Sequence, residues 1–116
     1  MQSTWVREMG EEEPVQYRVI VQQTAFNDID RIVDYVEDRS HQGAASVIDM
    51  LWKACTSLAL LPKRYKVFRP HRDPSQIVRS MPVAPFVIYY RVFDIERVVR
   101  VLTVRHGSRR QPKRFP

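Results

Sequence analysis

Residues 97–109 constrain the fold more than any other stretch of the chain. The apolar residues in it are Val98, Val99, Val101, Leu102 and Val104, and a Gly-Ser turn signal follows them. Because β-branched and aliphatic side chains suit a pleated, buried surface, the stretch predicts a central β-strand. The cationic side chains along this strand and just past its end are Arg97, Arg100, Arg105, His106, Arg109 and Arg110. The end of the strand is therefore the first candidate binding site.

A second strand signal, residues 86–93, comes just before the first and reads Phe-Val-Ile-Tyr-Tyr-Arg-Val-Phe. The connection between the two stretches, residues 94–96, is short enough for a hairpin, so we predict two adjacent antiparallel strands. Since side chains alternate along a strand, Tyr89 and Tyr90 are expected on opposite faces of the sheet. We expect one tyrosine in the core and the other in a groove, and the sequence leaves open which is which.

The beginning of the chain predicts a strand followed by a helix. Residues 15–22 alternate between apolar and polar side chains, with a partly polar side that suits an edge strand. Over residues 24–37, apolar side chains recur at steps of three and four residues, as they do on one side of a helix. Thr24 is the expected cap of this helix, and Asp28 and Asp30 are expected in its first turn, near the positive end of the helix dipole.

Turn-forming residues at 38–43 separate this helix from a second apolar stripe, residues 47–61, which Pro62 ends. The two helices should pack as an antiparallel pair. Cys55 lies within the second stripe, so we expect it to be a small core residue rather than a reactive thiol. It is the only cysteine, which excludes an internal disulfide framework.

Residues 62–75 combine three prolines with several lysines, arginines and aromatic residues, and they predict a loop with a cationic surface. Residues 77–82 predict a short strand before the hairpin. The order of strand, two helices and three strands is an α+β pattern. It predicts one small twisted sheet of about four strands, in which the last three form an antiparallel meander and the helix pair covers the sheet.

We predict one domain, residues 15–110. Residues 1–14 show no apolar periodicity and are expected to be disordered, and residues 111–116 are expected to form a basic tail. The chain contains no apolar run of the length of a membrane span and no signal-like leader, so we expect a cytoplasmic protein. Its histidines and glycines lack the spacings of metal, phosphate-loop or dinucleotide sites, so we expect no metal or cofactor.

The net charge of +6 is unevenly distributed along the chain. Residues 1–62 hold 5 Lys and Arg against 10 Asp and Glu, whereas residues 63–116 hold 14 against 3. The field of the second half attracts a polyanion or an acidic protein segment, and the charge alone does not distinguish the two.

The sequence of residues 86–109, FVIYYRVFDIERVVRVLTVRHGSR, resembles the C-terminal hairpin of the RelE/ParE superfamily, the toxins of type II toxin–antitoxin modules. Leu60-Leu61-Pro62, Val78-Arg79 and His106-Gly107-x-Arg109 occur with it at suitable spacings, so the likeness covers residues 15–110. The resemblance implies the same order of strands and helices as the residue patterns predict.

The ParE-like branch of this superfamily implies a toxin of the plasmid-stabilisation type, which inhibits DNA gyrase without enzymatic activity. It also implies neutralisation by a cognate acidic antitoxin in a hetero-oligomer. Recognition then depends on guanidinium groups that bind carboxylates or phosphates. The residues expected to bind the target or the antitoxin are Arg79, Arg91, Arg105, His106, Arg109 and Arg110.

The RelE-like branch implies instead a ribosome-dependent mRNA endoribonuclease. His106 would then act as the acid or base, and Arg109 and Arg91 would stabilise the developing phosphorane charge. This function ranks second, because Val87 stands at the strand position where RelE-like nucleases resemble one another in carrying an arginine. A non-toxic nucleic-acid-binding module ranks third, since the basic loop allows it but no recognition motif supports it.

Overall fold

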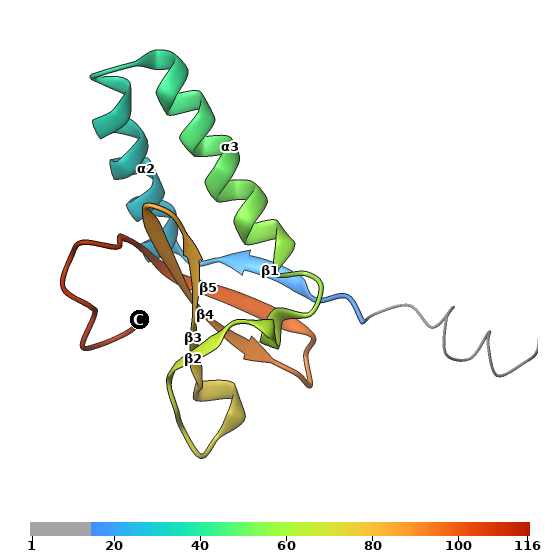
Figure 1. Ribbon diagram of the computed structural model, residues 1–116. Coiled ribbons are helices and arrows are strands. Elements are labelled where there is room, and N and C mark those ends of the chain that lie inside the picture. The colour runs from blue at the N-terminus through green and yellow to red at the C-terminus, as the bar shows by residue number, and fades with distance from the viewer. Residues whose placement is uncertain (1–14) are drawn as a thin grey trace, which may run out of the picture.

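The computed structural model describes residues 15–116, and the extension predicted to be disordered, residues 1–14, lies outside them. Within the described range, a five-stranded sheet carries a pair of helices on one face (Figure 1). The strands are β1 (Arg18–Val21), β2 (Lys66–Arg69), β3 (Val78–Val83), β4 (Phe86–Phe93) and β5 (Val98–His106), and the helices are α2 (Gln23–Glu37) and α3 (His41–Ser57). The predicted α+β class is confirmed.

The strand order is β1-β5-β4-β3-β2, and β1 runs parallel to β5 while all other neighbours are antiparallel. The predicted meander of β3, β4 and β5 is confirmed, but the sheet as a whole is mixed. The expected count of about four strands is wrong, because β2 comes from residues 62–75, which were predicted to form a loop. β2 has only four residues and lies at the edge of the sheet, where Pro70 and the charged Lys66 and Arg69 weaken its strand signal.

The first helix, α2, begins one residue before the predicted cap. Gln22 occupies the cap position in an extended conformation and makes no side-chain cap hydrogen bond. The prediction for Thr24 is therefore wrong, and Asp28 and Asp30 lie beyond the first turn. The Asp28 carboxylate binds β5 instead of the start of its own helix. A tertiary contact with β5 thus determines the role of Asp28, whereas the sequence pattern predicted an interaction with the helix dipole.

The second helix, α3, begins at His41, inside the segment predicted as a turn. Ser40 caps it by accepting a hydrogen bond from the Gly43 N–H at 3.0 Å. A Cβ atom on Gly43 would lie 3.3 Å from the Val36 side chain, so the glycine allows the helices to approach closely at this end. α3 ends at Ser57, before Leu61 adopts a left-handed conformation with φ of 48°. The antiparallel helix pair is confirmed (Figure 1).

The main core lies between the sheet and the helix pair. Its fully buried side chains include Leu51, Cys55 and Leu58 from α3 and its C-terminal end, together with Ile88 and Tyr90 from β4. The prediction that Cys55 is a core residue is confirmed. Burial raises the pKa of its thiol to about 11, which leaves almost no reactive thiolate at neutral pH.

A β-bulge divides the hairpin of β4 and β5. Tyr89 pairs with Thr103 and Tyr90 pairs with Val101, so Leu102 is an extra residue in β5. Tyr89, Leu102 and Val78 form a second, smaller cluster, separate from the main core that contains Tyr90. The predicted opposition of the two tyrosines is confirmed, and Tyr90 is the one that faces the helices. The expectation that the other tyrosine lies in a groove is wrong, because Tyr89 is buried as well.

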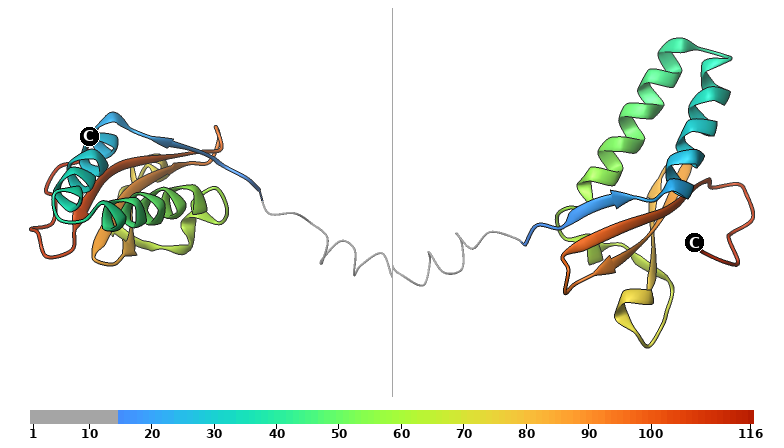
Figure 2. Two further views of the ribbon diagram at one scale, coloured as in Figure 1. Left: turned by 90° about the horizontal axis from the view of Figure 1, so that it is seen from above. Right: turned by 180° about the vertical axis from the view of Figure 1, so that it is seen from behind.

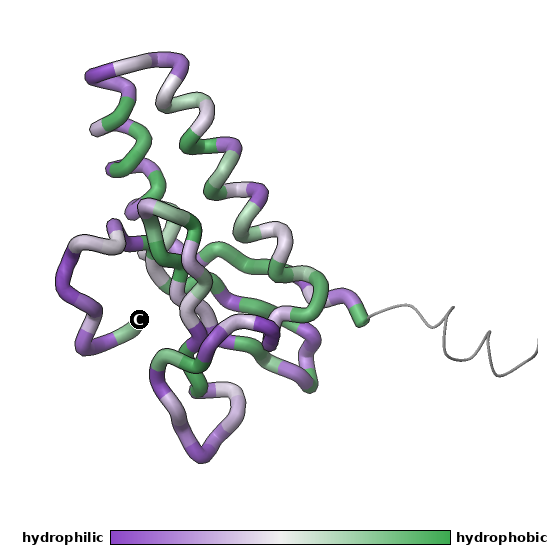
Figure 3. The backbone as a smooth tube through the Cα atoms, viewed as in Figure 1, coloured by the Kyte–Doolittle hydropathy of each residue, from purple (hydrophilic) through white to green (hydrophobic). Residues whose placement is uncertain are grey.

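After β5 the chain turns, and residues 111–116 return across the face of the sheet that the helices leave uncovered (Figure 2). We call this segment the tail. Most of it is hydrophilic, in contrast to the strands beneath it (Figure 3). Among residues 15–116, no helix combines the length and the apolar character that crossing a lipid bilayer requires.

Candidate functional site

A groove of about 690 Å³ lies between the helix pair and the end of β5. Its residues come from both helices, from the turn between β3 and β4, and from the end of the hairpin. The apolar ones are Ile32, Val36, Val47, Pro85, Phe86 and Val104, and the polar or charged ones are Asp28, Arg31, Tyr35, His106, Ser108 and Arg109. The groove therefore joins an apolar floor to a predominantly cationic rim.

Asp28 fixes the position of α2 against β5. β1 pairs with β5 only as far as Val101, so the edge of β5 beyond that residue has no neighbouring strand. There the Asp28 carboxylate accepts hydrogen bonds from the Val104 N–H, at 3.1 Å, and from the Thr103 hydroxyl. It also forms an ion pair with the exposed Arg31. One carboxylate thus satisfies hydrogen-bond donors on the unpaired edge of β5 and holds Arg31 at the rim of the groove.

The turn after β5 holds His106 and Arg109 at the other rim. The Gly107 N–H donates to the Pro85 carbonyl at 2.7 Å, and a Cβ atom on Gly107 would lie 3.2 Å from that oxygen. The Arg109 N–H donates to the His106 carbonyl at 3.0 Å. A side chain at this position would crowd the Pro85 carbonyl, so glycine favours the close backbone approach that shapes the His-Gly-x-Arg turn.

The His106 ring is oriented by two neighbours. It lies edge-on to Phe86, with ring centroids 5.7 Å apart. Its Nδ1 atom accepts a hydrogen bond from the Ser108 N–H at 3.1 Å and lies 2.8 Å from the Ser108 hydroxyl oxygen. In the neutral ring this arrangement places the proton on Nε2.

Arg79, the first of the predicted site residues, lies away from the groove. Its guanidinium group donates to the carbonyl oxygens of Lys63 and Tyr65, at 3.1 and 2.8 Å. These bonds connect β3 to the segment that leads from α3 into β2. The structure therefore gives Arg79 a bracing role in the fold.

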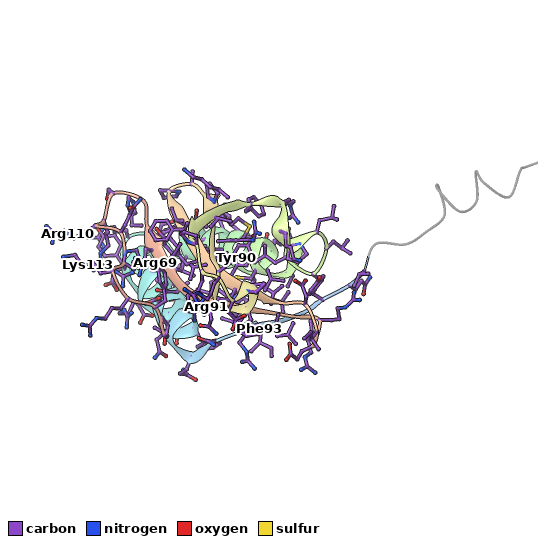
Figure 4. All side chains as sticks on the ribbon, turned by 90° about the horizontal axis from the view of Figure 1, so that it is seen from below. Arg69, Tyr90, Arg91, Phe93, Arg110 and Lys113 are labelled. Carbon is purple, nitrogen blue, oxygen red and sulfur yellow. The ribbon has the colours of Figure 1, made fainter. Side chains whose placement is uncertain are left out.

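Two further predicted residues, Arg91 and Arg105, lie on the face that the tail covers. Arg91 donates to the main-chain oxygen of Pro116 at 2.8 Å, and burial lowers the pKa of its guanidinium group. Arg105 lies near Tyr89, where its charge lowers the pKa of the tyrosine while burial raises it more strongly. Arg110 is exposed at the outer margin of the chain just before the tail (Figure 4).

The six predicted site residues thus fall into separate places. His106 and Arg109 meet at the groove, Arg91 and Arg105 share the opposite face, Arg79 braces the fold, and Arg110 is exposed. Sequence reasoning missed three residues that contribute to these surfaces, namely Arg31 and Tyr35 at the groove and Arg69 beneath the tail. The cationic character of residues 62–75 was the available signal for Arg69, whereas no local pattern distinguishes Arg31.

Among residues 15–116, no cluster of three or more His, Cys, Asp or Glu side chains is arranged to hold a metal ion. Guanidinium groups lie beside aromatic rings at these surfaces, as Arg39 does beside Tyr35 and Arg69 beside Phe115. Such groups bind carboxylates and phosphates through directed, charge-assisted hydrogen bonds.

Known proteins resemble this chain in sequence and in fold. Residues 19–111 match the family model of the ParE toxin of the type II toxin–antitoxin system, parDE. No curated protein sequence gives a significant match. The fold is similar to a chain of the chromosomal ParDE toxin–antitoxin system from P. aeruginosa, with 20% identity, a TM-score of 0.61, and coverage of 78% of this chain and 96% of that one.

It is also similar to a chain of the RelBE2 toxin–antitoxin complex from Mycobacterium tuberculosis, with 23% identity and a TM-score of 0.56. That match covers 82% of this chain and 95% of the other. At these identities the structures support the fold, while the family model spans the helices, the sheet and the groove. The chain therefore belongs to the ParE toxin family, within the RelE/ParE superfamily of type II toxins.

Proposed function

We propose that this protein is a cytoplasmic, growth-inhibiting toxin that acts on DNA gyrase without enzymatic activity and is neutralised by a cognate antitoxin. The observation that carries the proposal is the ParE family match over residues 19–111, which includes every residue that lines the groove. The assignment of the target to gyrase rests on this branch of the superfamily.

The groove supports the second half of the proposal, the antitoxin. Its apolar floor suits the apolar side of an amphipathic helix, with anchors three or four residues apart. Arg31, His106 and Arg109 at the rim suit carboxylates on the polar side of such a helix. An acidic antitoxin segment that folds on binding fits both features, and it would form a hetero-oligomer with the toxin.

The positions of the catalytic candidates favour gyrase inhibition over mRNA cleavage. A nuclease site would need His106, Arg109 and Arg91 around one phosphate. In the structure His106 and Arg109 line the groove, whereas Arg91 lies beneath the tail on the other side of the sheet. The Nδ1 atom of His106 is also occupied by Ser108. Recognition by arginine clusters on separate surfaces fits this arrangement better than catalysis does.

Two assays on one purified sample test the proposal. The first measures supercoiling and cleavage complexes formed by gyrase on plasmid DNA, and the second measures mRNA cleavage on programmed ribosomes. We expect inhibited gyrase and intact mRNA. Cleaved mRNA with unaffected gyrase would reverse the assignment and make the protein a nuclease. Addition of an antitoxin encoded beside the toxin should restore gyrase activity.

A further inference from the structure

The tail is bound to the sheet by two arginines that lie beneath it. Arg69 of β2 donates to the Lys113 carbonyl at 2.6 Å and to the Pro112 carbonyl at 3.4 Å. Arg91 of β4 donates to the main-chain oxygen of Pro116 at 2.8 Å. Figure 4 shows Arg69 and Arg91 on this side of the sheet and Lys113 at the outer margin of the tail. Both ends of the tail are therefore held by guanidinium groups.

Between these arginines, one aromatic side chain of the tail covers an apolar floor. The Phe115 ring lies 5.9 Å from Phe68 and 5.4 Å from Tyr89, measured between ring centroids. Val78 and Leu102 complete the floor and are buried together with Tyr89. This surface, which we call the tail-covered face, thus has an aromatic pocket with a cation on each side.

The charge of the tail does not complement the face on which it lies. Lys113 and Arg114 belong to the tail and Arg109 and Arg110 lead into it, while the face itself contributes Arg69, Arg91 and Arg105. The acceptors that the tail offers to Arg69 are the neutral carbonyl oxygens of Pro112 and Lys113. A carboxylate would form shorter and stronger bonds with the same groups.

Arg91 also has unused hydrogen-bonding capacity. Its Nε atom is buried and has no hydrogen-bond partner among the described residues. An arginine can bind a carboxylate through two parallel N–H groups, whereas the Pro116 oxygen occupies one Nη atom. The tail therefore satisfies the arginine less completely than an acidic ligand would.

We propose that the tail-covered face is a binding site for an acidic peptide segment with an aromatic anchor, and that the tail is its intramolecular substitute. The inference rests on the proposed function, in which the segment belongs to the protein target of the toxin. The present occupant is itself a peptide, and its backbone spacing already matches the two guanidinium groups. This favours a peptide over a single-stranded nucleic acid, although both carry acceptors and flat rings.

Because the tail occupies the tail-covered face, an acidic peptide can bind there only after the tail is released. A ligand that requires the open face binds with an affinity reduced by the fraction of molecules in which the face is closed. Phe115→Ala removes the anchor of the tail while leaving Arg69 and Arg91 in place. We expect this variant to bind an acidic peptide about tenfold more tightly than the unaltered protein.

The probe is a fluorescein-labelled peptide, Glu-Glu-Phe-Glu-Glu with both ends blocked, and the readout is fluorescence anisotropy with the full chain. In the Phe115→Ala background, Arg91→Lys should weaken binding about tenfold, because lysine keeps the charge but loses the paired N–H groups. Lys53→Gln removes a cation from the exposed side of α3 and is the control, with a change of less than about twofold. Equal effects of Arg91→Lys and Lys53→Gln would overturn the site.

Titration of the unaltered protein, followed by NMR of its backbone amides, keeps the test independent of any one variant. Peptide binding should move the amide signals of residues 111–116 towards those of a free segment. Peptide binding without that movement would overturn the inference that the peptide replaces the tail. Oligothymidylate of equal charge is the nucleic-acid control, and tighter binding of it than of the peptide would overturn the peptide assignment.

These outcomes are separate from those of the gyrase assay. Gyrase inhibition without peptide binding would overturn the inference about the tail and leave the proposed function intact. Tail-dependent peptide binding without gyrase inhibition would contradict the proposed target while supporting the peptide site.

Discussion

The groove and the tail-covered face belong to the same sheet but are held by different kinds of bond. At the groove, the Asp28 carboxylate is largely buried and satisfies donors on Thr103 and Val104. On the tail-covered face, Arg69 and Arg91 bind main-chain oxygens that water or another acceptor can replace. Loss of the first set leaves buried groups unpaired, whereas the second set can be exchanged. The groove is thus part of the fold, and the tail is a replaceable cover.

Asp28→Ala would break this comparison most directly. The substitution leaves the Val104 N–H and the Thr103 hydroxyl without their acceptor, so the free energy of unfolding should fall by about 2–3 kcal/mol. Urea denaturation measures the change. Asp30→Ala, on an exposed position of the same helix, is the control and should change the value by less than about 0.5 kcal/mol. Equal losses in the two variants would show that the Asp28 bonds do not hold the groove together.

Arg79→Ala tests whether the helix-covered side of the sheet depends in general on fixed polar bonds. Removal of the guanidinium group leaves the exposed Lys63 carbonyl to water and the part-buried Tyr65 carbonyl without its donor, so the free energy of unfolding should fall by about 1 kcal/mol. Gyrase inhibition should persist at a temperature where the variant is folded. Arg72→Ala, in an exposed loop, provides the comparison. A stable but inactive Arg79→Ala variant would show that Arg79 belongs to the binding surface after all.

Arg109→Ala addresses binding at the groove rather than its stability. Arg109 lies at the rim, so its loss should weaken antitoxin binding by about fivefold, the size expected of a partly solvated ion pair. Calorimetric titration with the antitoxin gives the affinity. Arg110→Ala removes the same charge one position further along and should change the affinity by less than about twofold. If Arg110→Ala lowers the affinity for the antitoxin more than Arg109→Ala does, the antitoxin lies nearer the tail than the groove.

The smallest effect concerns pH. Hydrogen bonds from Lys63 and Tyr17 lower the pKa of Asp94, although burial opposes them. Because the folded-state pKa lies below the unfolded value of 3.8, this contribution is present above that value and is lost as the pH falls through the folded pKa. The carboxylate is partly exposed, so its contribution should be less than about 1 kcal/mol.

Urea denaturation of the unaltered protein and of Asp94→Asn between pH 7 and pH 2 checks this expectation. The two stabilities should differ at neutral pH and converge in acid. A difference in stability between the unaltered protein and Asp94→Asn that stays constant with pH would contradict the lowered pKa of Asp94.

The elements that the sequence predicted correctly are those whose pattern is local and repeated. The aliphatic runs of β4 and β5 and the apolar stripes of α2 and α3 indicate burial without reference to the rest of the chain. β2 gave no such signal, because an edge strand of four residues between prolines resembles a loop. The parallel pairing of β1 with β5 depends on a contact between distant segments, which no local pattern predicts.

The candidate site was less predictable because its arrangement depends on the bulge. Arg100 and His106 are six residues apart, and strict alternation would place both on one face of β5. Arg100 pairs with Arg91, so the same reasoning would bring Arg91 and His106 together. The extra residue, Leu102, reverses the alternation, and His106 lies at the groove instead. The residue types were informative, but their faces could not be assigned from spacing.

The bulge also has a consequence for how such a chain can diverge. Deletion of Leu102 would leave Arg100 and His106 five residues apart, so a regular strand would still carry His106 on the groove side and Arg91 on the other. If β5 instead kept Leu102 and paired with β4 without a bulge, every side chain after Val101 would turn to the opposite face, and His106 would lie on the side of Arg91. A change that removes the bulge without removing a residue would thus redistribute the same cations between the two faces of the sheet.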